Sequence, residues 1–142
     1  MSFNNLKSRI KKNEGYSNKP YKDQLGFYTI GYGHLIKKNE NKYFNKKFNK
    51  KYFQRIFLMD FNKALKDYKT ILYKRTHKKH EKELLIEMVF QLGIRGVLKF
   101  KKTIFYLNKK QKYMASLEMI DSLWYKQTPC RVNNLIKNYL KN

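Results

Sequence analysis

The residues of this chain that could do chemistry are concentrated in one short stretch, residues 13–35. It contains Glu14, Asp23 and Thr29, spaced nine and then six residues apart, and four of the six glycines. Hydrolysis of a glycosidic bond needs one carboxylic acid to protonate the leaving oxygen, and a second group to activate water or stabilise the oxocarbenium ion. Glu14 and Asp23 could fill these roles across a cleft, with Thr29 holding the water. Spacing alone favours a simpler alternative, in which Glu14 is a surface residue and Asp23 forms a turn.

The segment before this stretch predicts a short helix over residues 3–13, with Ser2 as its N-cap. Gly15 is a plausible C-terminal stop for the helix. Glu14 therefore comes at the C-terminal end, where the helix dipole disfavours a negative carboxylate. That placement suits a proton donor.

The stretch itself predicts a small β element. Residues 23–26 are typical of a turn, residues 27–30 of a strand, and residues 31–34 of a tight return that exposes the backbone. We expect a hairpin sheet of two or three strands that carries Asp23 and Thr29.

The middle of the chain predicts helices. Phe44, Phe48 and Tyr52 recur every four residues, which indicates a short amphipathic helix with a lysine face. A lysine face that is simply exposed to solvent is the preferred interpretation, ahead of a dedicated nucleic-acid site. A long helix is expected over residues 51–73, and His77 with His80 is expected to be a surface pair, because no third metal ligand is near.

The remainder of the chain predicts a helical body, so the fold class is α+β and mostly helical. The most apolar segment, residues 81–92, should be the buried core helix. Shorter helices are expected over residues 93–100, 102–108 and 111–123. Thr128 and Pro129 should open a final helix, as a cap followed by proline in the first turn.

The composition limits the function without naming it. A chain of 142 residues forms one compact unit, and its single cysteine, Cys130, excludes an intrachain disulfide. The formal net charge of +23 favours polyanionic partners such as nucleic acid, anionic lipid or a bacterial wall, or it reflects lysine drift in an AT-rich genome. The first ten residues hold no apolar core of a signal peptide, and no run approaches the ~20 apolar residues of a membrane span.

Several blocks of the chain resemble the phage-type lysozymes, glycoside hydrolase family 24. The first block combines Glu14-Gly15, Tyr21-Lys22-Asp23 and the run GFYTIGYGHL at residues 26–35. MVFQLG at residues 88–93 and WYKQTPCR at residues 124–131 resemble two further blocks, in the family's order. The stretch from about residue 85 to residue 131 can be laid along the family without a gap, so together with the first block the resemblance covers about half of the chain.

The resemblance implies a single lysozyme domain over residues 1–142, with a two-lobed fold. One lobe, about residues 14–55, would contain the small sheet. The connecting helix would cover about residues 51–73. The helical lobe would contain about residues 74–142, together with the N-terminal helix at residues 1–13.

The resemblance also implies an enzyme without a cofactor or metal, which cleaves the β-1,4 bond between N-acetylmuramic acid and N-acetylglucosamine in peptidoglycan. Glu14 matches the general acid, Asp23 the acidic residue that positions or activates water, and Thr29 the hydroxyl that holds this water on the opposite sugar face. Inversion at the anomeric carbon would follow.

Other residues match supporting positions. His34 matches a residue paired with an acid of the long helix, for which Asp60 is the candidate, and Arg131 matches a basic residue that orients the catalytic acid. Leu35, Phe90 and Thr103 match positions that line the substrate cleft. Gln91 is expected to serve the cleft wall because it is on the same buried helix as Phe90, and Glu118 stands at a position that contacts the sugar. The chain departs from the family where Glu87 and Glu118 replace neutral amides, and where Leu25 and Leu123 replace an opposite-charge pair.

The implied partner is bacterial peptidoglycan, with a holin-type membrane protein needed for release. As an endolysin, the protein would be a monomer that stays in the host cytoplasm until it reaches the cell wall and lyses the cell. The alternative from another class is a non-catalytic polycation that binds nucleic acid, or an anionic membrane or wall. Against this alternative, the aromatic residues fall on helical core stripes, and no specific nucleic acid is expected.

Overall fold

A computed structural model describes residues 2–72 and 76–141 of the chain. The chain divides into two compact units, residues 1–63 and 64–142, and each is described below by itself. The N-terminal helix falls within the first unit by this division, whereas the predicted lobes assign it to the second. The lobe boundaries themselves stay a prediction.

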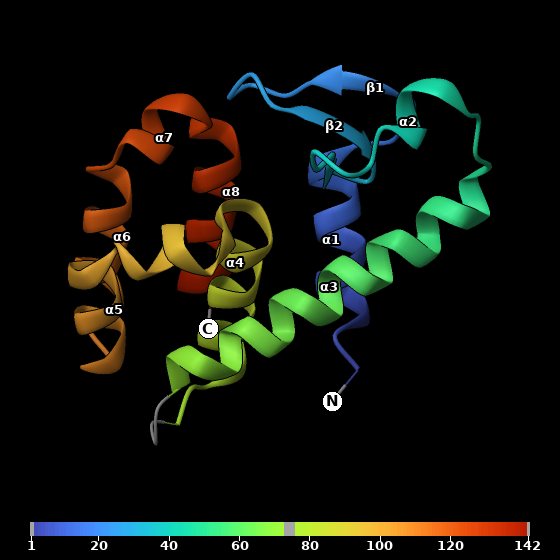
Figure 1. The fold of residues 1–142 in the computed structure, drawn as a ribbon. Coiled ribbons are helices and arrows are strands. Elements are labelled where there is room, and N and C mark those ends of the chain that lie inside the picture. The colour runs from blue at the N-terminus through green and yellow to red at the C-terminus, as the bar shows by residue number, and fades with distance from the viewer. Residues whose placement is uncertain (1, 73–75, 142) are drawn as a thin grey trace. The chain divides into compact units, whose positions relative to one another are not determined.

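The first unit combines helices with a small antiparallel sheet, in the strand order β1-β2-β3 (Figure 1). Its elements are α1 (Asn4–Glu14), β1 (Ser17–Lys22), β2 (Tyr28–Gly31), β3 (His34–Leu35), α2 (Lys42–Asn45) and the first part of α3 (Lys50–Leu72). Each strand pairs with the next one along the chain, so the expected hairpin sheet is confirmed. The expected fold class, α+β and mostly helical, is confirmed as well.

Helix α1 ends at Glu14, one residue beyond the predicted range of residues 3–13, and Gly15 follows it as the predicted stop. Gly15 follows its last residue with φ +70°, and the Gly15 N–H still donates to the Lys11 carbonyl at 3.0 Å. Glu14 is therefore the last helical residue, as expected. The predicted cap is wrong, because Phe3 occupies the N-cap position and no side chain caps the helix.

The amphipathic helix expected around residues 44–52 is wrong. The chain is helical in the short α2, which ends at Asn45, and again from the start of α3 at Lys50, but residues 46–49 between them are not helical. Tyr43 of α2 is 2% exposed and forms a core cluster with Ile30 and Phe53. Phe48 stacks on Tyr52 at a ring distance of 4.4 Å. The four-residue spacing of aromatics therefore reflects packing around this cluster from two segments, and not one face of one helix.

Helix α3 confirms the long helix that the sequence predicts. Its observed bounds are Lys50–Leu72, while residue 73 and the side chain of Leu72 lie outside the described part of the chain. No glycine or proline interrupts it, and its buried side chains recur at helical spacing. These side chains are Phe53, Phe57, Phe61, Ala64 and Tyr68.

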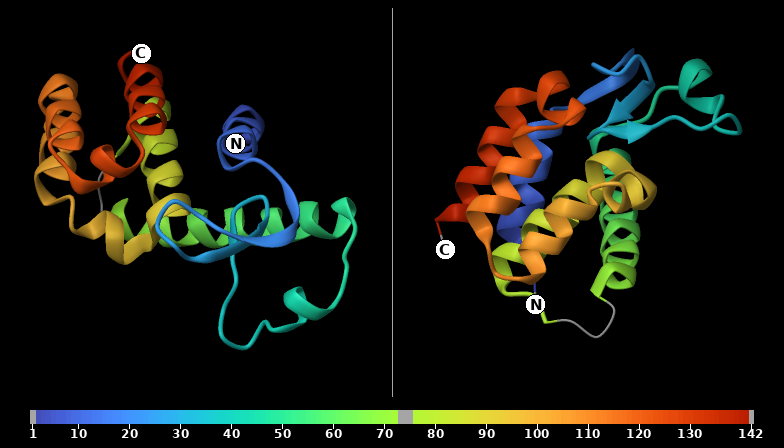
Figure 2. Two further views of the ribbon diagram at one scale, coloured as in Figure 1. Left: turned by 90° about the horizontal axis from the view of Figure 1, so that it is seen from above. Right: turned by 90° about the vertical axis from the view of Figure 1, so that its left-hand side faces the viewer.

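The second unit is helical, and its helices pack side by side (Figures 1 and 2). They are α4 (Lys79–Leu98), α5 (Lys101–Asn108), α6 (Lys112–Ile120), α7 (Leu123–Gln127) and α8 (Pro129–Leu140). Helix α8 contacts α4, α6 and α7, and α5 contacts α6. The segment from Leu84 to Val89 is buried on all sides, so the predicted core helix is confirmed.

Two helix boundaries of the second unit differ from prediction. Helix α4 continues past residue 92 through a kink at Gly93, where φ is +72°. The single helix expected over residues 111–123 is instead α6 followed by α7. The break comes at Ser122, whose hydroxyl accepts a hydrogen bond from the Tyr125 N–H at 3.1 Å. Pro129 opens α8 as predicted, but the Thr128 side chain makes no cap and donates to the Trp124 carbonyl.

His77 is buried, so the expected surface pair with His80 is wrong. The His77 side chain is 4% exposed in the second unit. Its Nε2 lies 2.9 Å from Asn108 Oδ1, and its Nδ1 lies 3.0 Å from the Tyr68 hydroxyl. The ring therefore joins α3 to α5 through side-chain hydrogen bonds.

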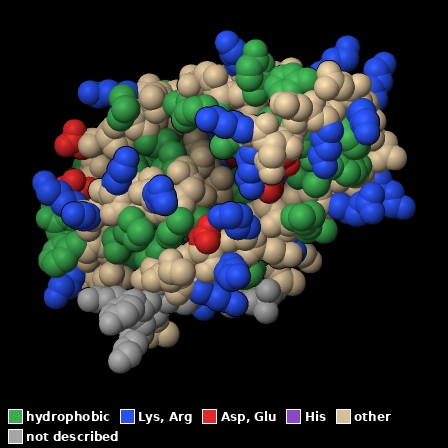
Figure 3. All heavy atoms as spheres, viewed as in Figure 1, with side chains coloured by type: hydrophobic (Ala, Val, Ile, Leu, Met, Phe, Trp, Pro, Cys, Tyr) green, Lys and Arg blue, Asp and Glu red, His purple; other side chains and the backbone are tan. Residues whose placement is uncertain are grey.

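Lys and Arg side chains are spread over the face of the molecule in Figure 3 and far outnumber the acidic ones there. This agrees with a count of 33 basic against 10 acidic residues in the sequence. In the described part of the chain, no helix has the length and apolar character of a membrane span.

Candidate active site

Glu14 lies against the turn that joins β2 to β3. A Cβ atom built on Gly33 would meet Glu14 Oε2 at 2.5 Å and Glu14 Cδ at 2.7 Å, closer than real contacts allow. Gly33 also has φ +77°, a backbone conformation that favours glycine. The tight return predicted from the sequence thus leaves room for the carboxylate, and helix α1 and this turn together fix its position.

Asp23 organises the turn between β1 and β2. Its Oδ1 accepts hydrogen bonds from the backbone N–H groups of Leu25 and Phe27, both at 2.9 Å. Among the described residues, no group donates a hydrogen bond to Oδ2. The structural alternative for Asp23, a turn former, is therefore confirmed. It is compatible with chemistry, because one oxygen is held while the other is left for a ligand.

Thr29 lies at the centre of one sheet face. It pairs with Tyr21 on β1 and with Leu35 on β3. Directly opposed residues of antiparallel strands point to the same face, so these three side chains form a row. Thr29 is 4% exposed and its hydroxyl donates to the Phe27 carbonyl at 3.1 Å, whereas Leu35 is 51% exposed.

Tyr21 connects this row to the two carboxylates. Burial raises the pKa of Tyr21, and the negative charges of Glu14 and then Asp23 raise it further. The Tyr21 phenol is therefore within electrostatic reach of both acids and is the cross-strand neighbour of Thr29. Sequence reasoning missed Tyr21 as a site residue. The signal for it was the YKD block, but which side chain faces Thr29 depends on strand register.

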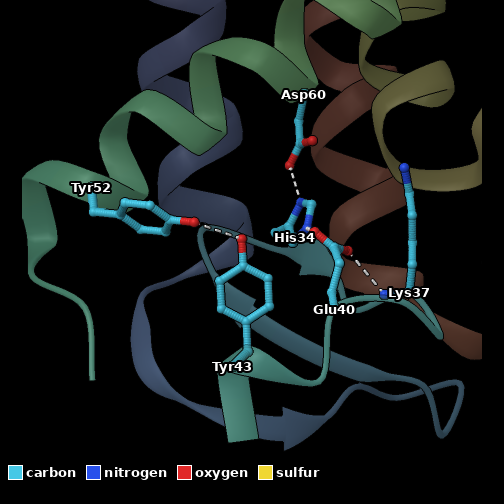
Figure 4. Close-up of polar contacts among 6 residues, drawn as sticks. All are labelled: His34, Lys37, Glu40, Tyr43, Tyr52 and Asp60. Carbon is cyan, nitrogen blue, oxygen red and sulfur yellow. Dashed lines mark hydrogen bonds and ion pairs between the residues drawn. The ribbon is translucent and has the colours of Figure 1, made fainter. Parts of the chain in front are cut away.

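His34 is held by two carboxylates on the opposite face of the sheet (Figure 4). Its Nδ1 lies 2.8 Å from Asp60 Oδ2, and its Nε2 lies 3.2 Å from Glu40. Burial lowers the pKa of His34, but the hydrogen bonds and charges of Asp60 and Glu40 outweigh it, so the net shift is upward. The predicted contact with Asp60 is present, and Glu40 is a partner that the sequence did not indicate.

The cluster around His34 supports the sheet. His34 pairs with Ile30 across β2 and β3, one position away from the row that contains Thr29. Successive residues of a strand point to opposite faces, so His34 faces away from Thr29. Glu40 also accepts the Lys37 N–H at 3.0 Å, which fixes the loop after β3 (Figure 4). This arrangement favours a structural ion pair.

The other predicted site residues belong to the second unit. Thr103 of α5 is 1% exposed, and Phe90 and Gln91 of α4 are partly buried. The Gln91 side-chain oxygen is buried without a hydrogen-bond partner among the described residues. Glu118 of α6 and Arg131 of α8 are partly exposed. The substrate and orienting roles of these five residues stay predictions.

A metal site has no support in the described residues, where no group of three or more His, Cys, Asp or Glu side chains could hold an ion. The site is instead built from two carboxylates, a hydroxyl and a phenol on a small sheet. Such a set can transfer protons and hold water.

Comparison with known proteins gives a consistent set of similarities. A family model described as phage lysozyme matches residues 11–138. "Probable T4-type lysozyme 2" of Dictyostelium discoideum is 31% identical over 155 residues, which cover 92% of this chain and 91% of that protein. "Probable T4-type lysozyme 1" of the same organism is 32% identical over 160 residues, with the same coverage of 92% and 91%.

Proposed function

This chain belongs to the phage lysozyme family and is therefore a glycoside hydrolase of the lysozyme type that acts on peptidoglycan, and from that premise we propose its bond, mechanism and role. The bond is the β-1,4 linkage between N-acetylmuramic acid and N-acetylglucosamine. The observation that carries the mechanism is the close approach of the Glu14 carboxyl group to the turn between β2 and β3, in the same small sheet whose first turn contains Asp23 and whose central strand contains Thr29.

Glu14 is the general acid of the proposed reaction. It donates its proton to the glycosidic oxygen as the bond to the anomeric carbon breaks. It is the last residue of α1, directly before the glycine that ends the helix. The contact with Gly33 limits where the carboxyl group can lie, and this supports a fixed direction of proton transfer.

Asp23 and Thr29 hold the attacking water. The Thr29 hydroxyl donates to the Phe27 carbonyl, so its oxygen is left to accept a hydrogen bond from water. Asp23 Oδ2 accepts the proton that water loses as its oxygen attacks the anomeric carbon. Water enters on the face opposite the leaving group, so the configuration at that carbon inverts.

The remaining residues bind and orient the sugar chain in this proposal. Leu35, exposed at the end of the Thr29 row, provides an apolar contact beside the water. Arg131 orients the catalytic acid. The second-unit residues that bind substrate are Phe90, Gln91, Thr103 and Glu118.

The biological role we propose is lysis of bacteria, in its simplest form as a phage endolysin. The enzyme would collect in the host cytoplasm as a monomer and reach the wall through a lesion made by a holin-type protein. The net charge of +23 supports attraction to an anionic wall.

The test is hydrolysis of purified peptidoglycan by wild type, Glu14→Gln and the charge-matched control Asp121→Asn, which changes an exposed residue at the end of α6. Glu14→Gln should lose about 10²–10⁴-fold in rate, because a positioned general acid contributes that much, while the control keeps wild-type activity. New reducing ends should appear at muramic acid, as the inverted anomer by NMR. Asp23→Asn should impair turnover and leave wall binding intact.

Three results would contradict the proposal. Full hydrolysis by Glu14→Gln would remove Glu14 from the acid role. Reducing ends at glucosamine would assign the enzyme to the other bond of the glycan. An initial product of retained configuration would exclude a single attack by water.

A further inference from the structure

Helix α6 carries apolar side chains on two opposite sides, and only one of these sides is covered. Ala115 and Met119 are fully buried. The opposite side exposes large apolar side chains, and the start of α7 continues it. We name this set the α6 patch: Tyr113 at 68% exposed, Met114 at 41%, Leu117 at 57%, Ile120 at 40% and Leu123 at 68%.

The spacing makes the α6 patch one continuous surface. Tyr113, Leu117 and Ile120 are four and three residues apart, so they line one side of the helix, and Met114 lies beside them. A contiguous exposed apolar surface rimmed by polar groups marks a site of interaction with a protein or a membrane.

The surroundings of the α6 patch are strongly basic. Residues 99–126 contain seven lysines and only two acidic residues, Glu118 and Asp121. Lys109 comes just before α6, and Lys126 follows Leu123 by three residues on α7, so those two share one side of that helix. We name Lys109 and Lys126 the lysine rim; Lys112, at the start of α6, instead donates to the Leu140 carbonyl at 3.4 Å. Lysine stems can lie along apolar surface while their ammonium groups reach a polar layer, as Lys109 does over the exposed Phe105 ring at 5.8 Å.

The chemistry of the α6 patch selects among its possible occupants. A second copy of the chain would bring two bodies of charge +23 together, which is repulsive. A glycan needs hydrogen-bonding groups and aromatic faces, but four of the five patch side chains are aliphatic or thioether. Nucleic acid phosphates match the lysines and leave the aliphatic side chains without a partner.

An anionic lipid bilayer matches both parts of this surface. Apolar side chains enter the boundary between headgroups and acyl chains, while lysines contact the negative headgroups. We propose that the α6 patch and its lysine rim dock this protein on the surface of an anionic lipid bilayer. The protein lies on the membrane in this state and does not span it.

The experiment measures co-sedimentation of the full chain with vesicles of phosphatidylglycerol or phosphatidylcholine. The patch variant is Tyr113→Gln with Leu117→Gln, since glutamine keeps helix propensity and leaves the net charge unchanged. The control is Leu58→Gln with Met59→Gln on α3, which are 42% and 66% exposed. Wild type and control should bind phosphatidylglycerol, and the patch variant should bind at least about tenfold more weakly, because each inserted aliphatic side chain contributes substantially to partitioning.

Binding at different salt concentrations distinguishes insertion of the apolar side chains into the bilayer from attraction between charges alone. Wild type should keep measurable binding at high salt, where surface electrostatics is screened, and the patch variant should lose it. Equal binding by both proteins, or complete loss of wild-type binding in salt, would overturn the proposal. Equal binding of wild type to phosphatidylcholine would overturn the role of the lysine rim.

Two further measurements test the other occupants. Weaker binding of the patch variant to lipid-free peptidoglycan would assign the patch to the wall, and a wild-type dimer that the variant does not form would assign it to self-association. Both outcomes overturn the membrane proposal. Hydrolysis of lipid-free peptidoglycan should be the same in wild type and the patch variant, so this proposal can fail while the lysozyme mechanism holds.

Discussion

Replacing Gly33 with alanine tests whether the β2–β3 turn sets the position of the catalytic acid. The new Cβ would lie 2.5 Å from Glu14 Oε2, and an ordinary contact begins near 3.4 Å, so the carboxylate must move by about 0.9 Å. A displacement of about 1 Å at a catalytic group can cost about 10²-fold in rate. We therefore expect kcat to fall about 10²-fold, with substrate affinity little changed.

A matched control separates this displacement from backbone strain. Gly26 has φ +84°, close to the +77° of Gly33, but its added Cβ would meet nothing within 4 Å. Each alanine in a left-handed conformation costs roughly 1–2 kcal/mol. Gly26→Ala and Gly33→Ala should therefore lose similar free energy of unfolding, while only Gly33→Ala loses activity.

The assay combines urea denaturation of both variants with initial rates on purified peptidoglycan. Wild-type activity in Gly33→Ala would refute the reasoning, because Glu14 could then act from a displaced position. An equal loss of activity in Gly26→Ala would also refute it, since strain alone would explain both. Glu14→Gln gives the lower limit of activity for the comparison.

Two further predictions concern stability. The pKa of His34 lies above its ordinary value of 6.5, so its ion pairs stabilise the fold fully below about pH 6.5. This stabilisation is lost as the pH rises through the pKa of His34 in the folded protein. The free energy of unfolding of the wild type should therefore fall over that range, and the fall should be smaller in Asp60→Asn. Tyr68→Phe leaves Nδ1 of the buried His77 without its partner and should lower the free energy of unfolding by about 1–3 kcal/mol in urea denaturation, with hydrolysis unchanged.

The candidate site could be predicted from the sequence where its geometry is local. Gly15 stops α1 and thereby places Glu14, and the Asp23 carboxylate closes its own turn within four residues. Turns of this kind need particular residue types, which are visible in a single sequence. Helices α3 and α4 could likewise be predicted from the sequence, because their apolar patterns are long.

The parts that were missed depend on contacts between segments. Tyr21 faces Thr29 only because the register of β1 shifts between Ser17 and Tyr21, and counting alternate residues cannot reveal such a bulge. Glu40 reaches His34 from an irregular loop. His77 looked polar and exposed, but tertiary hydrogen bonds allow its burial.

The errors in helix limits have a similar origin. The aromatic spacing at residues 44–52 fits a helix. In the structure, however, a short helix and a non-helical connection bring the aromatic side chains to the core cluster around Tyr43. The break between α6 and α7 contains no glycine or proline, so only the capping hydrogen bond of Ser122 reveals it.

The contact between Glu14 and Gly33 also bears on the order of folding. The end of α1, both hairpin turns and the Thr29 row all come from residues 14–35, so assembling them closes only short loops. Loop-closure entropy rises with loop length, and short-range contacts form faster than long-range ones. We therefore expect the acid and the water-holding residues to gain their mutual geometry early in refolding, ahead of the packing of α8 against α4, which are far apart in the sequence.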